Sequence, residues 1–85
     1  MRSTSSRETD EAYRAVLAVT ADRRYRVINC KDGIQWIVQR RDIAGGRWRS
    51  QTFYRRKASL LRDVGNLSDK GFLATIERFP EIHMA

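Results

Sequence analysis

The sequence of 85 residues predicts an α+β domain with a three-stranded antiparallel sheet and helices on one face, in the order α-β-β-β-α-α. Three observations lead to this fold class. Apolar residues recur at helical spacing before residue 20, residues 25–54 are rich in β-forming residues with two turn signals, and two short helical patterns follow. We expect one domain over residues 1–85, with a frayed start at 1–5 and a tail at 81–85.

The first helix is predicted over residues 6–20. Ser5 and Glu8 have the spacing of a capping box, in which each side chain bonds the backbone of the other residue. The apolar positions that follow form one stripe, made of Ala12, Tyr13, Val16, Leu17 and Thr20. This stripe is expected to pack on the sheet.

A hairpin is predicted around Asp32-Gly33, because this pair suits a tight turn with positive φ at both positions. The turn places Ile28 opposite Ile37 and Val27 opposite Val38. We assign the larger and more aromatic face to the core, with Tyr25, Val27, Ile34, Trp36 and Val38. The other face has an apolar centre edged by polar residues and is expected to be a contact surface, with Arg26, Ile28, Cys30 and Ile37.

Gly45-Gly46 predicts a second turn, and the third strand is expected over residues 47–54. Trp36 is expected in the core, whereas Trp48 remains open between core and surface. Leu60, Leu61 and Val64 then predict a helix that ends at Gly65. A last helix is predicted over residues 69–78, with Ser68 as its cap and Pro80 as its stop.

The charge is concentrated on the predicted sheet. The formal net charge is +7, and fourteen of the 17 basic residues are arginine. Residues 23–57 contain eleven basic residues against two acidic ones. Such a balance indicates an anionic partner, although a merely solvated basic surface is the simpler alternative. Three cations at the start of the helix after residue 57 oppose its dipole, which favours an anion there.

Catalytic chemistry is not indicated, and we expect a non-enzymatic protein without cofactor or metal. His83 stands alone in the predicted tail and is expected to be exposed. Cys30 is expected to be a buried thiol, and a Cys30–His83 nucleophile pair would lack an orienting third group. No apolar run approaches the roughly 20 residues of a membrane span and no signal peptide is evident, so a cytoplasmic protein is expected.

Arginines interleaved with aromatic residues are typical of nucleic-acid binding, with charges for phosphates and rings for stacking. The candidate binding residues are Arg26, Arg40, Arg41, Arg47, Arg49, Phe53, Arg55, Arg56 and Lys57. The partner is expected to be a nucleic acid or an acidic surface of a nucleic-acid-handling protein complex, and not a membrane.

Two nucleic-acid-binding families resemble parts of this sequence. The segment GGRWRSQTFYRRKASLL resembles the last strand and helix of the arm-binding domain of tyrosine integrases, although that domain lacks a first helix. The α-β-β-β-α order with Arg55-Arg56-Lys57-Ala58 resembles the double-stranded-RNA-binding domain, whose second helix begins with a phosphate-clamping basic cluster. That family has a longer loop with a histidine where this chain has only Lys31-Asp32-Gly33.

The whole sequence also resembles the small, arginine-rich orphan proteins of bacterial phages and plasmids, the group from which anti-CRISPR proteins come. This resemblance implies a single domain without catalytic chemistry, and it transfers no residue roles. Two hypotheses follow. The arginine-rich sheet face engages nucleic acid directly, as in a DNA-binding protein, or it docks on an acidic protein surface of a CRISPR effector as an inhibitor that binds no free DNA.

Overall fold

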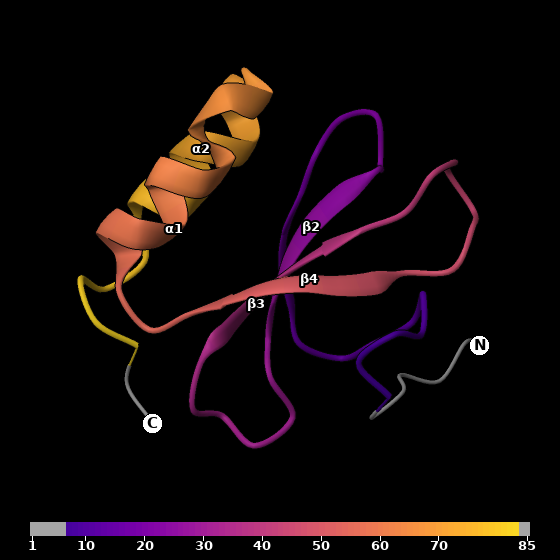
Figure 1. Cartoon of the computed structure of the whole chain (residues 1–85), viewed down its shortest axis with the longest axis horizontal. Coiled ribbons are helices and arrows are strands. Elements are labelled where there is room, and N and C mark those ends of the chain that lie inside the picture. Colours follow the sequence, from indigo (N-terminus) through magenta and orange to yellow (C-terminus); the bar gives the residue numbers. More distant parts are fainter. Residues whose placement is uncertain (1–6, 84–85) are drawn as a thin grey trace.

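The computed structural model describes residues 7–83, which form a four-stranded antiparallel sheet followed by two α-helices (Figure 1). The strands are β1 (Val16–Val19), β2 (Tyr25–Asn29), β3 (Trp36–Arg40) and β4 (Arg49–Tyr54). They lie in chain order, so β1 and β4 are the edges of the sheet. The helices are α1 (Lys57–Val64) and α2 (Lys70–Glu77), separated by a 3₁₀ turn, η1 (Gly65–Leu67).

The α+β class and the antiparallel sheet are therefore confirmed, but the predicted strand number and element order are wrong. The described residues run β-β-β-β-α-α, because the predicted helix over residues 6–20 does not form. Residues 7–15 make turns, and Val16–Val19 pairs with β2 as a strand. Two of its four residues are β-branched valines, which favour a pleated surface. Ser5 lies outside the described residues, and Glu8 accepts a hydrogen bond from the Lys31 amide instead of capping a helix.

The register of the predicted hairpin is confirmed. Ile28 pairs with Ile37, Val27 with Val38 and Asn29 with Trp36. The turn itself is looser than expected, because only Gly33 of the two turn residues has a positive φ, of 69°. Ile34 was expected in the core but is 47% exposed, since it belongs to the loop rather than to β3.

The main core lies between the two helices and one face of the sheet. It contains Ala18, Val27, Trp36, Val38, Leu60, Val64, Phe72 and Ile76. The face assigned to the core is thus largely right, and Trp36 is only 3% exposed. Figure 1 shows α1 and α2 side by side at one end of the molecule, while the loop between β3 and β4 extends away from them at the other end.

The second face of the sheet is also buried over β2 and β3, which corrects the prediction of a contact surface there, although Phe53, opposite Ile37 on β4, is exposed. Tyr13, Ile28, Cys30 and Ile37 form a second small core, against which Ala15 and Val16 pack. The turns of residues 7–15 cover this face in place of the predicted helix. Cys30 is a buried free thiol, as expected.

The helix ends differ from the prediction in small ways. Gly65 is right-handed and opens η1, and the left-handed residue is Ser68, with φ of 58°. Asp69, not Ser68, caps α2, and its carboxylate accepts a hydrogen bond from the Phe72 amide at 2.9 Å. The Ala21 amide also donates to Asp69, at 2.8 Å, and these bonds hold its pKa below the ordinary value.

The predicted tail is part of the fold as far as residue 83. Ile82 bridges to Arg56, the Lys57 amide donates to the Glu81 carbonyl, and the His83 amide donates to the Arg55 carbonyl. The C-terminal segment 81–83 therefore pairs with the chain between β4 and α1. Residues 84 and 85 lie outside the described part.

Candidate functional site

The eleven basic residues of the stretch 23–57 divide into a buried group and an exposed group. Arg26 and Arg41 are each 2% exposed, and Lys57 is half-buried. The other eight lie at the surface, and they are Arg23, Arg24, Lys31, Arg40, Arg47, Arg49, Arg55 and Arg56. The expectation that Arg26 and Arg41 lie on a contact surface is therefore wrong.

The two buried arginines enclose Trp48. Their guanidinium carbons lie 4.4 Å and 4.1 Å from the centre of the indole ring, for Arg26 and Arg41 respectively. Glu11 completes the group: its carboxylate accepts hydrogen bonds from the Trp48 indole N–H, at 2.9 Å, and from Arg41. We call Glu11, Arg26, Arg41 and Trp48 the buried arginine cluster. It settles the position of Trp48, which is 2% exposed and belongs to the interior.

Burial of these cations is possible because the N-terminal turns present many acceptors. Arg26 donates to the Glu8 and Asp10 carbonyls at 3.0 Å and 2.9 Å, and to the side-chain oxygen of Gln39 at 2.7 Å. Arg41 donates to the Arg23 carbonyl at 2.7 Å. A guanidinium has five donors in a fixed plane, so one side chain can serve several carbonyls that would otherwise be buried without partners. The cluster thus fixes the covering segment onto the sheet.

The electrostatics of the cluster follow from this packing. Burial disfavours the charged form of Arg26 and lowers its pKa to about 10, although the charge of Glu11 opposes that change. For Glu11, burial alone would raise the pKa, but the hydrogen bonds from Trp48 and Arg41 and the charge of Arg41 outweigh it. The pKa of Glu11 is therefore below its ordinary value. The carboxylate of Glu11 and the guanidinium groups of Arg26 and Arg41 thus bond other groups of the same chain.

The remaining candidate arginines lie along one edge of the molecule. Arg40 and Arg49 face each other across β3 and β4, Arg47 precedes β4, and Arg55 and Arg56 follow it. We call these five residues the basic edge. Apart from Asp42, 3.9 Å from Arg40, no carboxylate lies within ion-pair distance of them among residues 7–83. β4 spans six residues, or roughly 20 Å at about 3.3 Å per residue, so the basic edge is an elongated surface.

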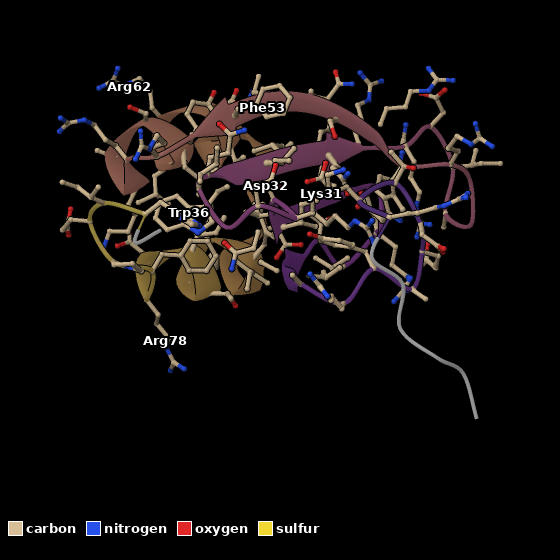
Figure 2. The ribbon with its side chains drawn as sticks, turned by 90° about the horizontal axis from the view of Figure 1, so that it is seen from below. Lys31, Asp32, Trp36, Phe53, Arg62 and Arg78 are labelled. Atoms are coloured by element: carbon tan, nitrogen blue, oxygen red, sulfur yellow. The ribbon has the colours of Figure 1, made fainter. Side chains whose placement is uncertain are left out.

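Phe53 and Lys57, the other two candidates, have different surroundings. Phe53 is 54% exposed, and Figure 2 shows it on the side of the molecule formed by β4 and α1, where Arg62 also projects. Lys57 pairs with the Glu81 carboxylate at 3.1 Å and donates to the Glu77 carbonyl at 3.0 Å. The anion expected at the start of α1 is thus partly supplied by the chain itself, and Lys57 is not a free cation.

His83 is a buried residue that the sequence did not reveal. It is 6% exposed, its Nε2 lies 2.6 Å from the Asn29 side-chain oxygen, and its ring meets Trp36 edge-on at 4.9 Å. Nδ1 is buried without a hydrogen-bond partner in the described part of the chain. Burial, with a contribution from Arg55, lowers the pKa of His83. The expectation of an exposed histidine is therefore wrong.

Neither a metal centre nor a membrane span is found in the part of the chain that the structure describes. Its histidine, cysteine and carboxylate side chains nowhere gather in a group of three that could hold a metal ion. No helix within residues 7–83 has the length and apolarity needed to cross a bilayer. Comparison of the chain with protein-family models, curated proteins and solved structures finds no match.

Proposed function

We propose that this chain is a non-enzymatic nucleic-acid-binding protein, of the kind carried in bacterial cells by phages and plasmids, and that its basic edge holds the phosphate backbone. The observation that carries this proposal is the division of the arginines. The buried arginine cluster is fully used in folding, whereas Arg47, Arg49, Arg55 and Arg56 are exposed without an acidic partner within residues 7–83. Exposed guanidinium groups suit phosphate oxygens in geometry and charge.

The shape of the basic edge suits an extended polyanion better than a compact one. Arg40, Arg47 and Arg49 lie at one end of β4, and Arg55 and Arg56 lie at the other. A nucleic-acid strand can contact charges at this separation because its phosphates recur along its whole length. This arrangement replaces the sheet face of the sequence prediction, since β2 and β3 are buried on both faces.

Binding to a labelled oligonucleotide across a range of salt concentrations tests this function. Each phosphate contact contributes a slope of about 0.7 for single strands or 0.9 for duplex on a log–log plot of affinity against salt. We expect a steep decrease in affinity with salt, corresponding to several contacts. Affinity no tighter than the ~10⁻⁴ M of weak non-specific binding, at physiological salt, would contradict the proposal.

A second candidate function is docking on an acidic protein surface, as an anti-CRISPR-type inhibitor would do. The specific observation in its favour is Phe53, an aromatic ring that is 54% exposed beside the basic edge. Buried aromatic anchors dominate many protein interfaces. Replacement of Phe53 by Ser distinguishes the two functions, because it would abolish inhibition of a protein complex but leave the salt slope of oligonucleotide binding unchanged.

A further inference from the structure

A surface cavity adjoins one end of the basic edge and has a different chemistry from it. The cavity has a volume of about 230 Å³ and lies between the helix-covered face of the sheet and the C-terminal end of α1. The residues that line it include Tyr25, Arg40, Gln51, Asp63 and Asn66. This volume is somewhat below the roughly 300–1,000 Å³ of typical ligand pockets, so the cavity fits one small group.

A β-bulge in β4 creates part of this lining. Val38 pairs with Thr52 and Gln39 pairs with Ser50, so Gln51 is an extra residue without a partner in β3. In a regular strand, Gln51 and Thr52 would point to opposite faces, yet both line the cavity. Bulges re-aim side chains in this way, and they are frequent next to functional sites.

The two amides of the cavity are free to bind a ligand. Gln51 and Asn66 are exposed, and their side chains make no hydrogen bond to other residues of the described part. Gln39 provides the contrast within the same sheet, since its buried amide bonds Arg26, Ser50 and the Glu8 carbonyl. A side-chain amide offers both donors and an acceptor, which matches the hydrogen-bonding edge of a nucleobase.

The charges around the cavity orient such a ligand. Tyr25, Arg40 and Arg49 pair in one row across β2, β3 and β4, so their side chains leave the same face of the sheet, and Tyr25 and Arg40 line the cavity. Asp63 lies in the lining, where its carboxylate accepts a hydrogen bond from Thr52 at 3.0 Å. A phosphate is therefore repelled from Asp63 and attracted to the two arginines, which leaves the cavity itself for an uncharged ring.

We infer that this cavity binds a single unstacked nucleobase, so that the chain prefers single-stranded nucleic acid. The inference rests on the proposed function, because Arg40 and Arg49 would hold the adjacent phosphates. Tyr25 supplies an aromatic surface, and Gln51 and Asn66 supply hydrogen bonds to the edge of the base. Bases in a duplex are already paired and stacked, so only a single strand, a loop or an end can supply one.

The test compares two labelled single strands of equal length and charge, one with normal bases and one with an abasic backbone. The wild-type chain should bind the base-bearing strand about tenfold more tightly, since only that strand offers a ring to stack on Tyr25 and an edge to hydrogen-bond the two amides. The double variant Gln51→Ala, Asn66→Ala should lose the part of this preference that comes from the hydrogen bonds, and should keep its affinity for the abasic strand. Gln35→Ala, at the opposite end of β3 from Arg40, is the matched control and should behave as wild type.

The outcomes separate this inference from the proposed function. Equal wild-type affinity for the two strands, with a steep salt dependence for both, would overturn the base site and leave backbone binding intact. A preference that survives unchanged in the double variant would overturn the assignment to this cavity. Failure to bind either strand at low salt would overturn both the base site and the proposed function. Both substituted side chains are exposed, so circular dichroism should show an unchanged fold.

Discussion

The buried arginine cluster and the basic edge use the same residue type for opposite purposes. Arg26 and Arg41 are 2% exposed, stack on Trp48 and donate to backbone carbonyls and to side-chain oxygens of Gln39 and Glu11. Arg49 lies on the edge strand β4 and Arg55 follows it, and neither forms an ion pair with an acidic side chain within residues 7–83. The first pair holds the fold together, and the second pair remains available to a ligand.

This difference teaches that local charge density does not locate a binding surface. Both groups come from the same basic stretch, and their sequence neighbours are similar. What separates them is whether acceptors from another part of the chain reach them. The N-terminal turns bring a carboxylate and several carbonyls to Arg26 and Arg41, whereas the unpaired side of β4 receives no such cover.

The largest effect is expected from removal of the ring between the two buried arginines. Trp48→Ala should lower the free energy of unfolding by about 3–5 kcal/mol, because it leaves a cavity and two buried cations without their stacking partner. Urea denaturation followed by circular dichroism measures this loss. A change below about 1 kcal/mol would show that the cluster does not stabilise the fold.

Glu11→Gln should lower the free energy of unfolding by about 1.5–3 kcal/mol, because it weakens hydrogen bonds that involve charged groups. The folded-state pKa of Glu11 is lowered, so its contribution is present above the unfolded value of 4.5 and is lost as pH falls through the lowered pKa. The wild-type chain should therefore lose stability below about pH 4.5, and Glu11→Gln should lose less over the same range. Parallel pH dependences for the two proteins would contradict the role of Glu11.

His83→Gln should lower the free energy of unfolding by about 1 kcal/mol, because it weakens the contacts of the C-terminal segment with Trp36 and Asn29. Because burial lowers the folded-state pKa of His83, the unfolded chain takes up the proton first. The wild-type chain should therefore lose stability as pH decreases below about 6.5. The variant lacks this titrating group and should not show this loss. Thermal unfolding of both proteins between about pH 7.5 and pH 5.5, at constant ionic strength, measures the difference in pH dependence between wild type and variant.

The smallest effect on stability is expected at the basic edge itself. Arg49→Ala should change the free energy of unfolding by less than about 0.5 kcal/mol, because the side chain is exposed. It should nevertheless reduce the salt slope of single-strand binding by about 0.7, the value of one phosphate contact. Arg78→Ala removes an equal charge at the end of α2, where Figure 2 shows Arg78 on the side of the molecule opposite Phe53, and the salt slope of this variant should equal that of the wild type.

The parts of the fold that the sequence predicted well depend on local patterns. The alternation around Asp32-Gly33 fixed the pairing of Val27 with Val38, because a shift of one residue would exchange the two faces of the sheet. Both helices after β4 were predicted nearly to their ends from apolar spacing, although the predicted capping roles of Gly65 and Ser68 were wrong. The helix predicted over residues 6–20 was wrong, because the apolar residues of that stretch are divided between the turns of residues 7–15 and β1.

The parts that failed depend on contacts between distant residues. Glu11 and Trp48 are hydrogen-bonded although 37 positions separate them in the sequence, and 31 positions separate Gln39 from the Glu8 carbonyl that it bonds. No local pattern indicates that a covering segment will bring acceptors to Arg26 and Arg41. The bulge at Gln51 could not be predicted from the sequence either, because it depends on how β4 pairs with β3.

The most direct test of the division between the two groups is a salt titration of single-strand binding with the variant Arg47→Ala, Arg49→Ala, Arg55→Ala, Arg56→Ala. These four residues were also expected from the sequence to bind. If they contact phosphates, the variant should have a salt slope smaller by roughly 3, at about 0.7 per contact, and should unfold at nearly the wild-type temperature. A variant that folds normally and binds with wild-type affinity and slope would contradict the account.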